Sequence, residues 1–199
     1  MVVGDEKAET GVVADALSFN ARLWREGKPT SFKLELYVTD SVVGLSGRGY
    51  LGKGALKGWL TGDSIKVFFP GTNEYLYESL DQVAHKTDCP VTVTGLNLLG
   101  LATTPPDSAA LANRILVTTD NRRQNRLEFD IGPTDTSCVW QVNLIYDREK
   151  SGWSVRDFRF VSGDELVLKA TRERYRQGVR VPRKRFEVVI PPDATRITP

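Results

Sequence analysis

The class of fold is decided by residues 42–79, VVGLSGRGYLGKGALKGWLTGDSIKVFFPGTNEYLYES. Three turn sequences, GKG, TGD and PGTN, divide this stretch into four apolar segments at 42–51, 55–61, 64–69 and 74–78. Breaks this short join only antiparallel neighbours, because a parallel pair of strands needs a long crossover connection. The stretch therefore predicts a meander of antiparallel strands.

A G-x-G-x-x-G pattern lies inside this meander at Gly47, Gly49 and Gly52. In a nucleotide-binding protein such glycines close a strand and open a helix, whose N-terminus meets the phosphates. Here the chain continues as KGALKGWLTGD, which has turn signals and no helical stripe. The pattern therefore does not predict nucleotide binding. We expect Gly47 and Gly49 to make room in the sheet for a bulky neighbour or a bend.

The sequence on both sides of this stretch predicts further secondary structure. Residues 32–38 alternate apolar and polar side chains, as a half-buried strand does. Before them, residues 12–24 have apolar side chains at helical spacing and are followed by Gly27 and Pro29, which predicts an N-terminal helix. After the middle of the chain, a second meander is expected at 114–119, 126–131, 138–147, 153–161, 165–176 and 185–190.

The middle segment, 79–113, has no clean period. Leu96, Leu98, Leu99 and Leu101 cluster between two glycines, which predicts a short helix or ordered loop packed over the sheet. The expected fold is mostly β within the α+β class: a single curved antiparallel sheet or incomplete β-barrel. The N-terminal helix and the central helical or loop insertion would cover its concave face. One domain would span residues 1–199, with flexible ends at 1–9 and 192–199.

Composition is that of an ordinary globular protein, with 26% charged residues and a net charge of +2 over 199 residues. This balance predicts neither disorder nor nucleic-acid binding. The start, MVVGDEKAETG, has no signal-peptide pattern, so the protein is either cytoplasmic or was separated from its export signal.

Residue types that carry catalysis or bind metals are sparse. His85 is the single histidine and lies in a polar stretch, where we expect an exposed loop residue. No catalytic or metal-binding motif is present, so we expect no enzyme, no cofactor and no metal site. The two cysteines, Cys89 and Cys138, are either one disulfide or two free thiols. We expect the disulfide if the protein is exported.

Two groups of residues suggest a binding role. Aromatic side chains crowd into residues 59–77 and 140–160, which fits either a filled core or a cavity under a curved sheet. Further on, strand alternation places Leu166, Leu168 and Ala170 on the same face as Arg172, Arg174 and Arg176, unless a bulge intervenes. These arginines would either form a solvated edge or hold a phosphate or anionic head group.

The order of elements resembles the superfamily of periplasmic lipoprotein carriers and outer-membrane receptors, the LolA and LolB proteins. Two stretches carry the resemblance: GYLGKGALKGWLTGDSIKVFFPGTNEYLYE and GVRVPRKRFEVVIPPDATRIT. It implies an incomplete barrel whose cavity receives acyl chains. It further implies a non-enzymatic binder in the periplasm, or a lipoprotein anchored to the outer membrane.

The apolar clusters, the basic stretch and the resemblance together predict a ligand-binding interior. Its residues would be Leu36, Val67, Phe69, Leu96, Leu98, Leu99, Trp140, Leu166, Leu168, Arg172, Arg174 and Arg176. The expected partners are lipid or the acyl chains of lipoproteins, and the basic stretch also fits an anionic membrane surface. We expect a monomer that binds no nucleic acid. The alternative is an envelope scaffold or sensor domain that binds proteins through a filled fold of the same kind.

Overall fold

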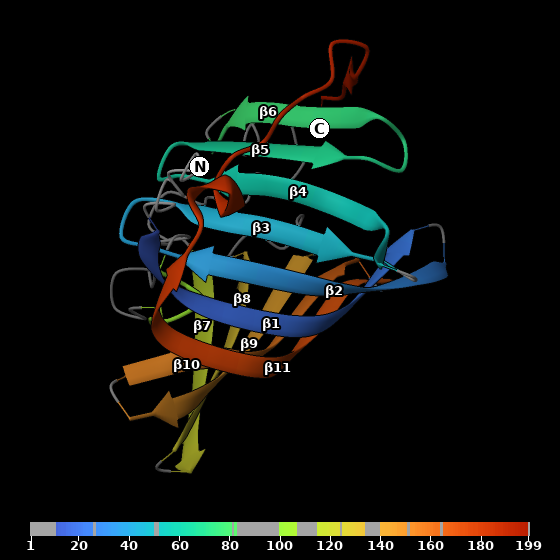
Figure 1. Cartoon of the computed structure of the whole chain (residues 1–199). Coiled ribbons are helices and arrows are strands. Elements are labelled where there is room, and N and C mark those ends of the chain that lie inside the picture. Colours follow the sequence, from blue (N-terminus) through green and yellow to red (C-terminus); the bar gives the residue numbers. More distant parts are fainter. Residues whose placement is uncertain are drawn as a thin grey trace, which may run out of the picture.

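A computed structural model describes residues 11–25, 27–49, 52–80, 82, 100–106, 115–123, 125–133, 140–150, 152–163 and 165–198. These residues form one large curved sheet (Figure 1). Its strands in chain order are β1 (Val12–Arg25), β2 (Lys28–Val38), β3 (Val43–Arg48), β4 (Gly54–Leu60), β5 (Ser64–Phe69), β6 (Glu74–Ser79), β7 (Ile115–Arg123), β8 (Arg126–Pro133), β9 (Trp140–Glu149), β10 (Gly152–Ser162), β11 (Glu165–Val181) and β12 (Thr195–Arg196).

The spatial order of the strands is β12-β6-β5-β4-β3-β2-β1-β11-β10-β9-β8-β7. Strands β1 to β11 are antiparallel to their neighbours, and the two-residue β12 pairs with β6 in parallel. The predicted meander from β2 to β6 and the second meander from β7 to β11 are both confirmed. The pairing of β1 with β11 joins the two meanders, and the sheet does not close on itself (Figure 1).

The predicted N-terminal helix is wrong, because residues 12–25 form strand β1. Leu17, Phe19 and Ala21 are buried on the concave face, whereas Ala14 and Ala16 are buried on the opposite, convex face. Both faces of one strand are thus covered along its first half. Two alternating apolar sets that overlap in this way imitate the spacing of a helix, which is why periodicity alone misassigned the segment.

The hairpin between β3 and β4 confirms that the glycine-rich pattern leads into a strand and not a helix. The Gly49 N–H donates to the Lys53 carbonyl at 2.8 Å, and Gly52 has a φ of 75°. A Cβ on Gly47 would lie 2.8 Å from Cγ of Leu56. Gly47 therefore makes room for a bulky neighbour, as predicted.

The C-terminal segment differs from the prediction. Residues 185–190 do not form a strand: Arg183–Arg185 form a short 3-10 helix, η2, and the chain then runs in front of β3 to β5 in Figure 1. Phe186 packs edge-on against Tyr37 with ring centroids 6.4 Å apart, on the convex face. The stretch from residue 192, where a flexible end was predicted, includes β12.

Of the middle segment, 79–113, the structure describes residues 79, 80, 82 and 100–106. Residues 100–106 contain a turn, in which the Thr103 and Thr104 amides donate to the Gly100 carbonyl at 2.9 and 2.6 Å. The predicted helical insertion is therefore not supported in the part that the structure describes. Leu96, Leu98 and Leu99, together with His85, Cys89 and Cys138, lie outside the described residues.

The main core lies on the concave face, where β1, β8, β9 and β10 meet the turn at 100–106. Its most deeply buried large side chains are Tyr146, Leu17 and Ile131. A smaller apolar cluster of Ala14, Ala16, Tyr37 and Val181 lies on the convex face. Among the described residues, no helix has the length and apolar character needed to cross a membrane.

Candidate functional site: an apolar cavity on the concave face

Strand register brings apolar side chains from distant segments onto one concave wall. Leu36 pairs with Leu45 across β2 and β3, and Leu45 pairs with Gly58 of β4. On the other side of β1, Ala170 pairs with Phe158. Paired residues point to the same side of a sheet, so these alternating apolar sets line up across the whole concave face.

This wall encloses an open cavity of about 320 Å³. From β1 to β4 it is lined by Phe19, Leu34, Leu36, Val43, Leu45 and Leu60. From β9 to β11 it is lined by Leu144, Val155, Phe158, Leu168 and Ala170. The turn at 100–106 adds Leu101 and Ala102. Every described side chain of the lining is apolar, and the volume falls at the lower end of the range for ligand pockets.

The turn at 100–106 is held over the cavity by two hydrogen bonds to the sheet. The Tyr146 hydroxyl donates to the Leu101 carbonyl at 2.6 Å, and the Val155 N–H donates to the Ala102 carbonyl at 2.9 Å. The last pair of β10 with β11 is Asp157 with Thr171, so Val155 lies where β10 has no partner in β11. The turn occupies the place where these two strands separate.

Burial keeps the Tyr146 hydroxyl protonated in its hydrogen bond to the Leu101 carbonyl. Tyr146 is fully buried, and burial raises the pKa of its hydroxyl well above the ordinary value for tyrosine. The hydroxyl therefore remains a neutral donor to Leu101 at any physiological pH. Leu101 was one of the leucines predicted to cover the concave face, and it does so.

The predicted ligand-binding residues are distributed unevenly around the cavity. Leu36 and Leu168 line it. Val67 and Trp140 are buried but are not part of the lining, and Phe69 is half-buried on β5 beyond the cavity. The backbone of Leu166 pairs with Val161. The indole N–H of Trp140 is buried and has no hydrogen-bond partner among the described residues.

Sequence reasoning missed the lining residues of β1 and β3, among them Phe19 and Val43. Phe19 was hidden by the helical interpretation of residues 12–24. The period of two in Leu17, Phe19 and Ala21, which are all almost fully buried, was the available signal. Ala102 could not have been found, because its role depends on the hydrogen bond from Val155.

A bulge separates the three arginines that were predicted to share a face. Phe19 pairs with Arg172, but Ser18 pairs with Arg174, so β11 has one extra residue at Glu173. Alternation resumes with the opposite phase. Arg174 and Arg176 therefore lie on the convex face with Ala16, and the predicted common face for the three arginines is wrong.

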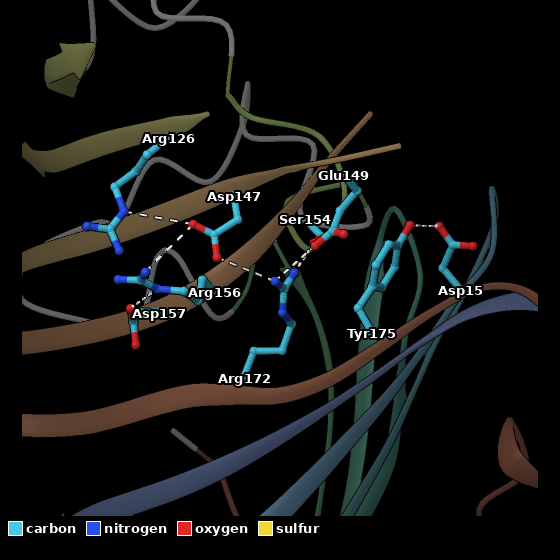
Figure 2. A network of polar contacts seen from close by, with 9 residues as sticks. All are labelled: Asp15, Arg126, Asp147, Glu149, Ser154, Arg156, Asp157, Arg172 and Tyr175. Carbon is cyan, nitrogen blue, oxygen red and sulfur yellow. Dashed lines mark hydrogen bonds and ion pairs between the residues drawn. The ribbon is translucent and has the colours of Figure 1, made fainter. Parts of the chain in front are cut away.

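Arg172 lies at the separation of β10 and β11, and its side chain crosses to β9 and β10 (Figure 2). Its guanidinium is 2.9 Å from a carboxylate oxygen of Glu149 and 3.5 Å from one of Asp147, and it donates to the Ser154 hydroxyl. Ser154 is completely buried and in turn donates to Glu149 at 2.9 Å. Sequence neighbours supply Arg172 with a single acid, but the fold supplies two more from β9.

Further ion pairs extend this network to β8. Asp147 also lies 3.8 Å from Arg126 and 3.7 Å from Arg156, while Arg156 bonds Asp157 at 2.7 Å. Burial raises the pKa of Asp147, and this effect outweighs the opposing influence of Arg172. Three arginines and three carboxylates thus neutralise one another, so Arg172 carries no spare charge for an anionic ligand.

Tyr175 continues the contacts onto β1 (Figure 2). Its hydroxyl donates to Asp15 at 3.0 Å, and its ring lies 5.8 Å from the Arg172 guanidinium carbon. Burial and the hydrogen bond to Asp15 raise the pKa of Tyr175 to about 12. The second oxygen of Asp15 accepts the Gly178 N–H at 2.8 Å. Gly178 has a φ of 58°, which suits glycine, at a second bulge of β11.

A more polar pocket of about 520 Å³ lies on the other side of the turn at 100–104. Asp15 lines it from β1, Thr39 and Asp40 line it from the loop between β2 and β3, and Thr103 and Thr104 line it from the turn. Among the described residues, its lining contains two carboxylates and no lysine or arginine. No cluster of histidine, cysteine and acidic side chains suited to a metal ion occurs among the described residues.

Comparison with known proteins found solved structures that are similar to this chain over most of its length. No family model matches the sequence, and no curated protein matches it. An uncharacterized conserved protein from Thermus thermophilus is 7% identical, with a TM-score of 0.46 over 92% of this chain and 89% of that one. A LolA superfamily protein from Nitrosomonas europaea is 11% identical, with a TM-score of 0.41 over 88% and 90%.

A DUF1329 family protein from Desulfovibrio piger is likewise 11% identical, with a TM-score of 0.43 over 90% and 91% of the two chains. The superfamily named from the sequence therefore has a member among the similar solved structures. Identities and TM-scores this low say nothing about a ligand.

Proposed function

We propose that the protein is a non-enzymatic binder of an acyl chain, taken from a lipid or a lipid-modified protein, in the apolar cavity of the concave face. The observation that carries the proposal is the cavity itself, which has a volume of about 320 Å³ and, among the described residues, an entirely apolar lining. Such a surface has no partner for a polar substrate and gains free energy only by excluding water from hydrocarbon.

The volume of the cavity limits the length of the chain that it can hold. A methylene group fills about as much space as a water molecule, roughly 30 Å³, so the cavity holds roughly ten carbons of one chain. Burial of each methylene contributes about 0.8 kcal/mol before the cost of association. A chain of this length would therefore bind reversibly, as a carrier requires.

The surroundings of the cavity argue against chemistry on the ligand. Among the described residues, no charged side chain lines the cavity, and Arg172, Asp147 and Glu149 on β11 and β9 are held in ion pairs with one another. Tyr146 is a neutral donor to a carbonyl. A place in the cell envelope, in the periplasm or anchored to the outer membrane, belongs to the same proposal and is supported by the sequence resemblance.

The experiment combines native mass spectrometry of the purified protein with titration of a fluorescent fatty acid. We expect a co-purified lipid, and saturable binding of the probe by the delipidated protein. Leu36→Trp would fill the cavity and abolish saturable binding. Leu23→Trp is the matched control, because Leu23 belongs to the neighbouring strand, is 40% exposed and does not line the cavity.

Two results would overturn the proposal. One is a protein that neither carries lipid nor binds the probe. The other is equal binding by the Leu36→Trp and Leu23→Trp variants, both folded by circular dichroism. Either result would favour the scaffold alternative, in which the same fold binds proteins and its concave face takes up no small ligand.

A further inference from the structure

The convex face of the sheet carries a marked excess of positive charge. Strand pairing places seven cations on this face of β2 to β5 and of β11: Lys33, Arg48, Lys57, Lys66, Lys169, Arg174 and Arg176. The carboxylates on the same face of these strands are Glu35 and Glu173. The whole chain has a net charge of only +2, so the imbalance is concentrated here.

Both carboxylates are already engaged. Glu35 lies 3.2 Å from Arg48 and 3.4 Å from Arg185 of η2, and Glu173 lies 3.0 Å from Lys33. The other five cations, at 57, 66, 169, 174 and 176, form no ion pair with any described residue. An uncompensated cluster of this kind attracts an extended anionic surface.

Aromatic side chains accompany the lysines at the β4–β6 end of this face. Trp59, Lys66 and Tyr77 form one row across the three strands, and Lys57, Phe68 and Tyr75 form the next. The Trp59 and Tyr77 rings are 6.0 Å apart, and Tyr77 is 47% exposed. The Lys66 ammonium lies 5.6 Å from the Tyr77 ring. No carboxylate lies on the convex face of β4, β5 or β6 among the described residues.

We propose that this convex face docks the protein on an anionic lipid bilayer. Tryptophan and tyrosine suit the boundary between lipid and water, because the ring is apolar and its tip is polar. Lysine stems lie along apolar surface while their ammonium groups reach the phosphates. A convex sheet cannot wrap around a rod-shaped polyanion such as duplex DNA, but it can lie against a plane.

The proposal does not rest on acyl-chain binding. The apolar cavity lies on the opposite face of the same sheet, so docking through the convex face leaves the cavity free. The C-terminal segment also runs over the convex face, where η2 adds Arg183 and Lys184 to the basic surface. Basic side chains near an anionic leaflet each strengthen binding about fivefold.

The test is flotation of the protein with vesicles of phosphatidylcholine, or of equal parts phosphatidylcholine and phosphatidylglycerol. We expect binding to the anionic vesicles alone. Binding should be strong where the Debye length is about 30 Å and lost in 1 M salt, where it is about 3 Å. Lys57→Gln/Lys66→Gln and Arg174→Gln/Arg176→Gln should each weaken vesicle binding about 25-fold.

Lys28→Gln/Lys150→Gln is the matched control, because it removes the same charge from exposed residues at the ends of hairpins. It should bind almost as well as the parent. Tyr77→Ser should weaken vesicle binding but leave retention on heparin unchanged. The proposal is overturned if anionic vesicles are not bound at low salt, or if the three double variants bind equally. Binding to duplex DNA with none to vesicles would also overturn it, in favour of a polymer partner.

Discussion

Replacing Arg172 by methionine should destabilise the protein far more than replacing a comparable surface arginine. The side chain of Arg172 is 12% exposed, and it contacts Glu149, Asp147 and the buried Ser154 hydroxyl. Methionine keeps the apolar stem and removes all three charged contacts. The loss leaves two carboxylates near each other and a hydroxyl without its donor.

The magnitude follows from burial. Breaking a fully buried ion pair costs about 3–5 kcal/mol, because the remaining charge is left uncompensated. Here the two carboxylates are 30% and 29% exposed, and Arg126 and Arg156 remain beside Asp147. We therefore expect a loss of about 2–3 kcal/mol in the free energy of unfolding at pH 7.

Urea denaturation of Arg172→Met and Arg48→Met gives the comparison. Arg48 pairs with Glu35 at 3.2 Å, but its side chain is 50% exposed, so its loss should cost about 0.5 kcal/mol. The difference between the two variants in the free energy of unfolding should become smaller as the pH falls from 7 towards 4. Burial raises the pKa of Asp147 and Arg172 lowers it, so the loss of Arg172 raises this pKa further above the ordinary value. A protein whose carboxyl group has a higher pKa in the folded than in the unfolded state gains stability when that group is protonated.

Equal losses for the two variants would refute this reasoning. So would a loss for Arg172→Met that stays constant between pH 7 and pH 4. Either outcome would mean that the network in Figure 2 contributes no more than exposed ion pairs do.

Three further predictions concern the turn, the sheet and Tyr175. Tyr146→Phe should cost about 1–2 kcal/mol and increase hydrogen exchange at residues 100–106, because it removes the 2.6 Å bond to Leu101; unchanged exchange would contradict this. Gly58→Ala should cost about 1–3 kcal/mol in urea denaturation, because its Cβ would lie 2.6 Å from the Lys66 carbonyl oxygen; the control Gly71→Ala meets nothing within 4 Å. Tyr175 should titrate near pH 12 by ultraviolet absorbance. Its folded pKa lies above the unfolded value, so the stability it contributes is complete below about pH 10 and is lost towards pH 12. Asp15→Asn should lower this pKa, and an unshifted titration would contradict the role of the hydrogen bond to Asp15.

The strands and their turns were accessible from the sequence, because their signals are local. Turn residues such as those of PGTN end a strand whatever surrounds them, and Gly47 marked a crowded position that Leu56 occupies. In residues 153–161, apolar side chains change parity between Val155 and Phe158, which predicts either a bulge or a strand buried on both faces. The register of β10 with β9 does shift between Val155 and Asp157. The prediction for residues 12–24 was wrong for the opposite reason. Both faces of this strand are buried in part, so its apolar and polar side chains do not alternate.

The site was less accessible, because one inserted residue moves side chains between faces. Local alternation from Leu168 to Arg176 is correct up to Arg172 and reversed after it. The partners of Arg172 come from β9 and β10, which no spacing in the sequence brings to it. The lining of the cavity also depends on strand order. Leu36 and Leu168 line the same cavity because β1 pairs with both β2 and β11.

The sequence by itself determined that this chain folds as antiparallel strands with a mostly apolar concave face, since turn chemistry and alternation act over a few residues. Only the tertiary structure decided where the sheet joins its two meanders, which arginine is neutralised, and which cations remain on the convex face. The physical reason is that strand order and bulges are set by contacts between residues far apart in the chain. A shift of one residue exchanges the two faces of a strand.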